Sequence, residues 1–292
     1  MTLFPRVLLT GATGFLGSHL LKALLNKGHE VVILKRSSSN VYRIQDEIGS
    51  IVSYDVDLQP LELAFKEQEI EVVIHTAGQY GRGDCGIVKM LESNVIFGVR
   101  LLDACQKYNT NIFINTDTML QSSLNNYSLS KKHFVDWLKQ YLEEVQIVNL
   151  KLEHMYGTKD DNNKFVSWFL SQLKDGVLEI KLTSGVQNRD FIYVDDVVSA
   201  FLTVLEKSKD LPKFIEFNVG TGQSIPVRDF VERVAYLYRK FNAESKTKLL
   251  FGAVPYRNGE EMSIDVDITG LQKIGWQAKV SLDEGLLKII QE

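Results

Sequence analysis

The sequence predicts an α/β fold: a Rossmann-type, doubly wound parallel sheet with a smaller, interleaved C-terminal lobe. Two patterns indicate this class. Short β-branched runs alternate with amphipathic segments through the first half of the 292 residues, and a glycine-rich turn directly follows the first of these runs. Strands that alternate with helices form a parallel sheet, since each parallel neighbour needs a long crossover connection. The chain is long enough to bury a large core.

Seven apolar runs are the expected strands, at residues 7–10, 31–34, 51–54, 72–75, 111–115, 147–152 and 214–219. Crossover helices are expected at residues 16–26, 88–107, 130–142 and 194–207. After Gly157 a polar loop at 158–163 begins a less regular region. We therefore expect a first domain over residues 1–157, to which helix 194–207 and strand 214–219 return. Residues 158–292 should form mainly a second lobe.

Composition and charge exclude several classes of protein. The 33 basic and 37 acidic residues give a net charge of −4, and 45% apolar with 24% charged residues is ordinary globular composition. Without a basic cluster we expect no nucleic-acid partner and no anionic membrane surface. Cys85 and Cys105 are too few for a disulfide framework, and no metal site is expected from the histidine spacing. The N-terminus has no secretory pattern and no apolar run approaches about 18 residues, so a soluble, cytoplasmic protein is expected.

A phosphate-binding loop is predicted between the first strand and the first helix, the context that a dinucleotide-binding fingerprint requires. Gly11 allows a tight turn, Gly14 lets the backbone approach the pyrophosphate, and Gly17 lets the helix pack closely on the strand. The alternative is an ordinary glycine-rich turn. The cofactor contacts expected in this loop are Gly11, Thr13, Gly14, Phe15, Leu16 and Gly17.

The end of the second strand indicates which dinucleotide binds. An NAD site usually has an acidic residue there to bind the ribose hydroxyls, but this chain has Lys35 and Arg36 followed by serines. Arg36 is therefore predicted to pair with the 2′-phosphate of NADP(H), unless both cations are merely solvated. After the third strand, Asp57 and Leu58 are expected beside the adenine, although Asp57 is also a common residue at the start of a turn.

A tyrosine and a lysine are predicted to form the reacting pair. Tyr127 and Lys131 are four residues apart, which places them on one face of a helix. A neighbouring ammonium favours the phenolate and lowers a tyrosine pKa from its usual value of about 10. Such a spacing often occurs by chance, but here it follows the fifth strand of a chain that carries the fingerprint. Thr116, at the end of that strand, is expected to orient a substrate carbonyl.

Taken together, these motifs resemble the extended short-chain dehydrogenase/reductases that act on nucleotide sugars, the NAD-dependent epimerase/dehydratase superfamily, over almost the whole chain. Further matching segments are His75-Thr76-Ala77-Gly78, Asn94, His154-Met155-Tyr156-Gly157, Arg189 to Asp196 and Asn218 to Gly222. Within this superfamily the chain is most similar to the CDP-abequose and CDP-paratose synthases and the dTDP-fucose-forming 4-keto-6-deoxy sugar nucleotide reductases. The runs Leu152-Glu153-His154 and Asn163-Lys164-Phe165 carry that similarity.

The resemblance implies that residues 1–157 are an NADP-binding Rossmann domain and that the second lobe binds a sugar nucleotide. It adds Thr76, Ala77, Gly78, Asn94, Tyr127, Lys131 and Leu152 to the cofactor site. It assigns Thr116, Asp117, His154, Asn163, Lys164, Arg189 and Arg257 to the substrate site. Arg189 and Arg257 would hold the diphosphate, with a structural ion pair from Arg189 to Asp190 or Asp195 as the alternative. The family also implies a homodimer through a four-helix bundle that includes helices 88–107 and 130–142.

Three reactions fit this scaffold. A 4,6-dehydratase has Glu after the Asp that follows the catalytic Thr, but Asp117 is followed here by Thr118, so dehydration is disfavoured. A 4-epimerase retains NAD, whereas the basic end of the second strand suits a reductase that consumes NADPH. The prediction is therefore reduction of the C4 ketone of a dTDP- or CDP-linked 4-keto-6-deoxyhexose for bacterial surface polysaccharide such as O-antigen. Epimerisation, and NADP sensing without catalysis, remain the alternatives.

Overall fold

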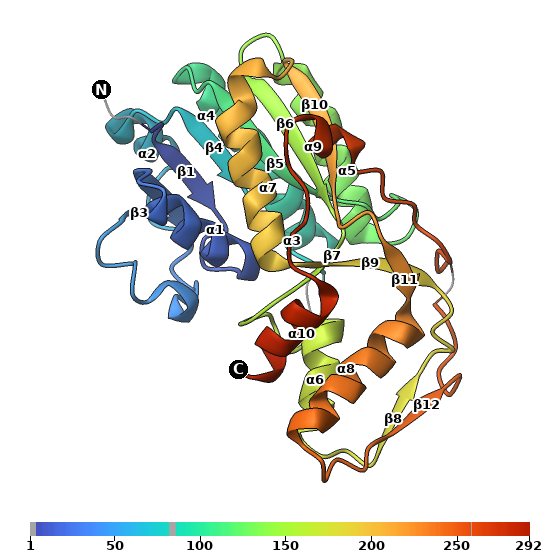
Figure 1. The fold of residues 1–292 in the computed structure, drawn as a ribbon. Coiled ribbons are helices and arrows are strands. Elements are labelled where there is room, and N and C mark those ends of the chain that lie inside the picture. The colour runs from blue at the N-terminus through green and yellow to red at the C-terminus, as the bar shows by residue number, and fades with distance from the viewer. Residues whose placement is uncertain (1–3, 82–85, 258) are drawn as a thin grey trace.

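The computed structural model describes residues 4–81, 86–257 and 259–292 (Figure 1). In this part of the chain, seven parallel strands form one sheet in the order β10-β6-β5-β4-β1-β2-β3. The strands are β1 (Val7–Thr10), β2 (Val31–Lys35), β3 (Val52–Asp55), β4 (Val72–His75), β5 (Ile112–Thr118), β6 (Gln146–Leu152) and β10 (Phe214–Val219). The order reverses between β1 and β4, the point where open α/β sheets bind ligands. The predicted fold class is confirmed.

Helices cover both faces of the sheet, which explains why the central strands are apolar on both sides. Every residue of β1 and β4 is buried. Helices α1 (Phe15–Asn26) and α7 (Val194–Lys207) pack on one face. Helices α2 (Glu62–Gln68), α4 (Phe97–Lys107) and α5 (Asn126–Leu138) pack on the other. In Figure 1, α7 lies across the sheet beside β6 and β10. It covers the same face as α1, although the two helices are far apart in sequence.

The second lobe contains two small sheets and several helices, at the bottom of Figure 1. The elements of its sheets are β7 (His154–Tyr156), β9 (Asn188–Tyr193) and β11 (Ser224–Pro226), and β8 (Glu179–Leu182) with β12 (Lys248–Phe251). Its helices are α6 (Phe165–Lys174), α8 (Val227–Phe241) and α10 (Leu282–Ile290). Helix α9 (Thr269–Lys273) instead packs beside β10, so the C-terminal segment also returns to the large sheet.

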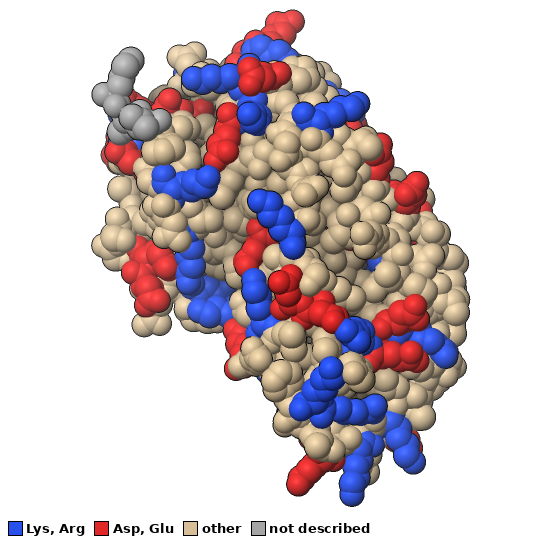
Figure 2. Space-filling view, viewed as in Figure 1, with Lys and Arg blue, Asp and Glu red and all other residues tan. Residues whose placement is uncertain are grey.

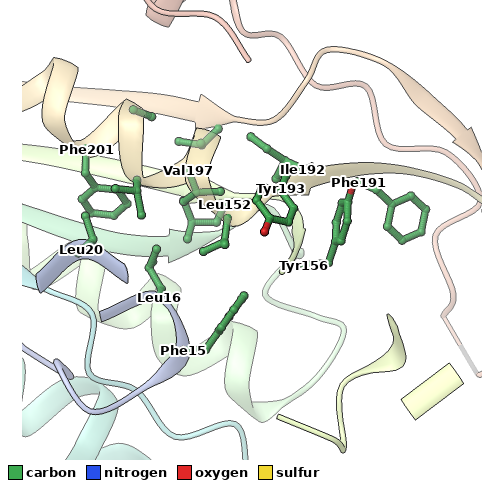
Figure 3. Close-up of a cluster of buried hydrophobic side chains, with 14 of the residues drawn as sticks. Phe15, Leu16, Leu20, Leu152, Tyr156, Phe191, Ile192, Tyr193, Val197 and Phe201 are labelled. Atoms are coloured by element: carbon green, nitrogen blue, oxygen red, sulfur yellow. The ribbon is translucent and has the colours of Figure 1, made fainter. Parts of the chain in front are cut away.

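One hydrophobic core joins the two parts (Figure 3). Leu16 and Leu20 of α1 meet Phe201 of α7 on the face of the sheet that these helices cover, and the same buried cluster continues through Tyr156 to Phe191 in the lobe. The phenol of Tyr156 lies against Gly285 of α10, where an added Cβ would come within 2.3 Å of the hydroxyl. This continuity fixes the lobe against the open end of the sheet.

Several predicted boundaries shift by one residue, and three elements differ by more, each for a local physical reason. Helix α5 begins at Asn126 instead of residue 130, because the side chain of Asn125 caps it by accepting from the Ser128 amide at 2.9 Å. Segment 88–107 is divided into α3 (Ile87–Leu91), a π-turn η2 (Glu92–Ile96) and α4. Strand β5 runs on to Thr118 because it pairs with β6 to its end.

The short helical turns are η1 (Tyr42–Ile44), η3 (Lys139–Tyr141) and η4 (Ser208–Asp210). Cys105 is buried in α4, and burial raises the pKa of its thiol to about 12. Cys85 lies outside the described residues.

Basic and acidic side chains are interspersed on the face seen in Figure 2. Among the described residues, no helix is both long and apolar enough to cross a membrane.

Candidate active site

The glycine loop between β1 and α1 has the geometry that the sequence predicts. Gly11 has a φ of +72°, and a Cβ there would come within 2.7 Å of the Ala77 amide nitrogen. A Cβ on Gly17 would lie 2.0 Å from the Gly11 carbonyl oxygen, so only glycine lets α1 pack this close to the loop. Gly14 is the N-cap residue of α1, and no side chain caps this end of the helix. The loop therefore leaves a helix N-terminus available for an anion.

At the ends of β2 and β3, the two loops are tied together. The Ser37 amide donates to the Asp57 carboxylate at 2.8 Å, and Lys35 forms an ion pair with Asp55 at 3.4 Å. Arg36 is exposed, and so is Leu58, at 79%. The Asp57 carboxylate therefore accepts a hydrogen bond from the backbone of the loop that carries Arg36, while the exposed Leu58 side chain presents an apolar surface at the ends of these strands.

Asn94 holds the loop that follows β4. Its side chain accepts from the Gln79 amide at 2.6 Å and donates to the Gln79 carbonyl and the Ser130 hydroxyl, both at 2.9 Å. The π-turn η2 carries Asn94 into this buried position; such turns are frequent at functional sites. Asn94 thus fastens residues 76–80, including Thr76, Ala77 and Gly78, to helix α5, which is a supporting role beside the cofactor contact expected from sequence.

Strand β5 ends in two residues with different surroundings. The Thr116 hydroxyl is buried and has no hydrogen-bond partner among the described residues. Asp117 points to the other face of the strand, where its carboxylate bonds Lys132 at 2.7 Å and Asn149 at 3.2 Å. Thr116 therefore offers a free hydroxyl to a ligand. Asp117, expected in the substrate site, is 2% exposed, and its charge acts to raise the pKa values of Tyr127 and Lys131.

Tyr127 and Lys131 both lie in α5, as predicted, but the pKa of Tyr127 differs from the expected one. Burial raises the pKa of Tyr127 well above its usual value, and Tyr80 and Asp117 raise it further. The lowered pKa that the sequence predicts for Tyr127 is therefore not found in this structure, where burial is the largest cause of the shift. Burial also lowers the pKa of Lys131, to about 8, despite the attraction of Asp117. Tyr127 is thus a phenol at neutral pH, which suits a proton donor.

His75, at the end of β4, is a structural neighbour of Lys131. Its Nδ1 lies 2.7 Å from the Thr10 hydroxyl, and its ring is surrounded by Phe97, Phe113 and Phe134. Burial and the Lys131 charge lower the pKa of His75 to about 3. The ring therefore stays neutral and fills the core beneath the site.

Two site residues were missed from sequence. Tyr80 stacks on Tyr127 with ring centroids 4.6 Å apart, and it contributes to the raised pKa of Tyr127. The ammonium of Lys164, which was predicted for the substrate site, lies 3.1 Å from the centroid of the Tyr80 ring. Lys164 therefore contacts Tyr80, the ring that stacks on Tyr127. A tyrosine two residues after His75-Thr76-Ala77-Gly78 was the available signal.

Arg43 is the second site residue that was missed from sequence. Its guanidinium donates to the Lys159 carbonyl at 2.9 Å and Asp161 at 2.6 Å, and reaches the Thr13 carbonyl at 3.5 Å. It therefore joins the glycine loop to the loop that begins the second lobe. Nothing in its sequence context distinguished it from a surface arginine.

The expected substrate-binding residues of the second lobe lie on β7, β9 and a neighbouring loop. His154 is half-buried, with Nδ1 2.8 Å from the Glu153 carboxylate. Arg189 is buried and pairs with Glu260, so its ion-pair partner is neither Asp190 nor Asp195. Asp190 instead binds the amides of Thr221 and Gly222.

The remaining predicted contacts lie on loops and at a strand end. Arg257 and Asn163 are exposed, and Leu152 is in the core at the end of β6 (Figure 3). Gln121, on the loop after β5, donates to Glu261 at 3.0 Å, which links that loop to the one carrying Arg257. Within the described ranges, no cluster of three or more His, Cys, Asp or Glu side chains could hold a metal ion.

These features together fit a dinucleotide at the carboxyl ends of the central strands. The glycine cradle would take the pyrophosphate, the loops after β2 and β3 the adenosine end, and Lys131 the nicotinamide ribose. Thr116 is at the end of β5, and Tyr127 is in the first turn of α5, which packs against that strand.

Comparison with known proteins agrees with this geometry. The model of the NAD dependent epimerase/dehydratase family matches residues 7–220. The CDP-abequose synthase of Salmonella muenchen is 32% identical over 294 residues, which span 98% of this chain and 97% of that protein.

Two solved structures are similar over 98% of this chain and 97% of their own. The UDP-glucose 4-epimerase of Thermotoga maritima with UDP-glucose has a TM-score of 0.83 at 24% identity. MoeE5 in complex with UDP-glucose and NAD has a TM-score of 0.81 at 25% identity. The fold and the glycine loop define a Rossmann-type extended short-chain dehydrogenase/reductase. More particularly, the chain belongs to the NAD-dependent epimerase/dehydratase family.

Proposed function

We propose that this protein is an NADPH-dependent reductase of the C4 ketone of a 4-keto-6-deoxyhexose linked to dTDP or CDP. Two observations carry the proposal: the Thr116 hydroxyl at the end of β5 is buried without a hydrogen-bond partner among the described residues, and Tyr127 on the neighbouring helix α5 remains protonated at neutral pH. A ketone that accepts hydride needs a donor for its oxygen and a group that fixes the carbonyl. The similarity to CDP-abequose synthase over almost both chains supports the substrate class.

The residues of this chain divide the work of the reaction. The dinucleotide supplies the hydride when bound. The Thr116 hydroxyl donates to the carbonyl oxygen and holds it in line, and Tyr127 gives that oxygen a proton as negative charge develops. The Lys131 ammonium, kept positive at neutral pH by Asp117, binds the cofactor ribose and stabilises the phenolate that Tyr127 leaves.

NADP(H) is the proposed cofactor because no carboxylate follows β2 directly. Arg36 is exposed at the end of that strand, and the Ser37 amide is fixed by Asp57. A guanidinium matches the geometry of a 2′-phosphate. A reductase consumes its reduced cofactor in each turnover, and NADPH suits this use better than a tightly held NAD.

The substrate is proposed to lie between the sheet and the second lobe. Arg189 would exchange its pairing with Glu260 for the diphosphate. Arg257 is close to Glu260, whose amide donates to the Arg257 carbonyl at 3.1 Å, and His154 is on β7, which pairs with the strand β9 that carries Arg189. The retained Tyr127 and Lys131 argue against a sensor without catalysis. We also propose a homodimer, supported by exposed apolar side chains on α3, η2 and α5.

The test mixes the purified protein with NADPH and either the CDP- or the dTDP-linked 4-keto-6-deoxyhexose. The expected result is loss of NADPH absorbance with one of them, and NMR of the product gives the C4 configuration. Tyr127→Phe should lower kcat by about 10²-fold while still binding NADPH. Interconversion of C4 epimers without net NADPH consumption would instead identify an epimerase.

A further inference from the structure

Glu153 is a buried carboxylate that the reaction described above does not use. Its side chain is 1% exposed, and its Oε1 atom has no hydrogen-bond partner in the part of the chain that the structure describes. The other oxygen, Oε2, lies 2.8 Å from Nδ1 of the His154 ring and accepts from the His154 amide at 3.2 Å. A buried carboxylate is costly unless it is paired. The His154 ring is therefore the side chain that Glu153 is placed to hold.

The backbone around Glu153 is fixed at the carboxyl ends of the large sheet. Its amide donates to the Val219 carbonyl at 3.0 Å, at the end of β10. One residue earlier, at the end of β6, the Leu152 carbonyl accepts from the Met119 amide at 3.2 Å, and Met119 directly follows β5. The turn from β6 into β7 is thus held on both sides. It presents His154 beside the strand that ends in the candidate active site.

His154 shares one face of a small sheet with Arg189. In the parallel pairing of β7 with β9, His154 lies opposite Phe191, and the two rings meet edge to face with centroids 6.0 Å apart. Arg189 precedes Phe191 by two residues on β9, and alternate residues of a strand point to the same side. Figure 1 shows β7 and β9 between the large sheet and the helices of the lobe. This face therefore borders the proposed substrate site.

The chemistry of the ligand defines which form of the ring would bind it. An ionised carboxylate only accepts hydrogen bonds, so Nδ1 of His154 donates to Glu153 and Nε2 is the nitrogen that remains for a ligand. The His154 side chain is 38% exposed, so a ligand can reach it. A diphosphate also only accepts, so Nε2 must donate to it. Both nitrogens of the bound ring then carry protons, and the Glu153 carboxylate compensates the charge of the imidazolium.

We propose that Glu153 is a positioning residue for the sugar nucleotide, because it holds the His154 ring so that Nε2 donates to the diphosphate. His154 makes the contact, and Glu153 acts through it. A carboxylate behind a histidine fixes the orientation of the ring in the same way at metal sites. The effect is on ligand binding and not on hydride or proton transfer. This role rests on the proposed sugar nucleotide site, but it does not depend on which reaction follows.

Binding of CDP and of dTDP tests this role without turnover, because both carry the diphosphate and neither carries a ketone. Titration calorimetry measures Kd for the parent and for Glu153→Gln, which keeps the shape of the side chain and removes its charge. A hydrogen bond to a charged group contributes about 10- to 100-fold to affinity. We expect Kd to rise by at least about tenfold in this variant. In the reductase assay KM should rise similarly, while kcat stays within about twofold of the parent.

Two further variants separate positioning from a role in the fold. His154→Ala should weaken nucleotide binding as much as Glu153→Gln does, and the double variant should bind no more weakly, since the carboxylate then has no ring to hold. Asp196→Asn is the matched control. Asp196 is 4% exposed and accepts from the Lys279 and Val280 amides at 3.0 and 2.8 Å, where no ligand contact is proposed. Its variant should bind nucleotide as the parent does.

Unchanged nucleotide binding by His154→Ala would overturn the contact with the diphosphate. This variant should fold even if Glu153→Gln does not, because His154 is partly exposed. Losses that add in the double variant would show that Glu153 does not act through His154, which also overturns the proposal. A parent that binds CDP or dTDP but reduces no keto-sugar nucleotide would contradict the reductase alone. A parent that binds neither nucleotide would overturn both proposals.

Discussion

At the scale of single residues, the charge of Lys131 should decide the alkaline limit of activity. Burial lowers its pKa to about 8, so the ammonium is lost as pH rises through that value. Tyr127 keeps its proton there, because its own pKa is raised. We therefore expect kcat/KM to fall above about pH 8, since kcat/KM reports the ionisation of the free enzyme. A profile that stays flat to pH 10 would contradict this assignment.

Arg36 should set the preference between the two cofactors. Its side chain is exposed at the end of β2, where the 2′-phosphate of NADPH would lie. The ribose hydroxyl of NADH is uncharged and does not need a guanidinium partner. Arg36→Ala should weaken NADPH binding by about tenfold or more and leave NADH binding nearly unchanged, as measured by fluorescence titration. Lys35→Ala is the control, because Lys35 is already paired with Asp55. Equal losses for both cofactors would place the 2′-phosphate elsewhere.

Single residues also show where sequence reasoning reaches its limit. The glycines at 11, 14 and 17 could be assigned because each has one local steric role, and Gly11 and Gly17 show it directly. The pKa of Tyr127 could not, because it depends on burial and on Tyr80, which is distant in sequence. The Arg189 partner, Glu260, was missed for the same reason, since 71 residues separate the two.

At the scale of elements, α5 depends on its cap to hold Tyr127 in place. Asn125 accepts from Ser128, and Ser128 closes a capping box with the Asn125 amide. Asn125→Ala should lower the free energy of unfolding by about 1 kcal/mol. It should also lower kcat, because Tyr127 lies in the first turn that the cap holds. Thermal unfolding and steady-state kinetics measure the two effects.

The control for this prediction is the cap of α10. Ser281 forms the same kind of capping box with Glu284, at a helix that carries no proposed site residue. Ser281→Ala should lose similar stability and keep kcat. If both variants reduce kcat equally, the effect of Asn125 is general destabilisation and the local argument fails.

Elements of the large sheet were predictable because their signals are local. The strands at 7–10, 72–75 and 214–219 and helix 194–207 match the structure to the residue. The start of α5 was placed four residues late, since its first turn is polar and only the Asn125 side chain marks it. The π-turn η2 was not predicted, because a five-residue widening of a helix leaves the amphipathic pattern almost unchanged.

At the scale of the whole molecule, the lobe and the sheet are fastened at the site itself. Arg43 connects the carbonyl of Thr13 in the glycine loop with Lys159 and Asp161 at the start of the lobe. The shared core, which runs through Tyr156 (Figure 3) to α10, also joins the lobe to the sheet. A ligand held by both parts would therefore meet a largely preformed site.

The outer faces of α3, η2 and α5 should pair with a second copy of the chain. These neighbouring elements expose large apolar side chains, which isolated soluble domains seldom gather on adjoining helices: Ile87, Val88, Leu91, Ile96, Leu129 and Trp137. Two copies related by a twofold axis would bury them in a four-helix interface. The helices that the family resemblance implies for a dimer thus expose apolar side chains, which supports the proposal.

Val88→Glu should therefore convert a dimer to a monomer without unfolding it, because Val88 is 69% exposed in the single chain and contributes little to the protomer core. A buried, unpaired carboxylate in the interface would oppose association. Sedimentation velocity over a range of protein concentrations measures the mass, and circular dichroism checks the fold. Leu178→Glu is the matched control, since Leu178 is 73% exposed but lies just before β8, away from these helices. A parent that sediments as a monomer, or two variants that remain dimeric, would show that these helices do not form the interface.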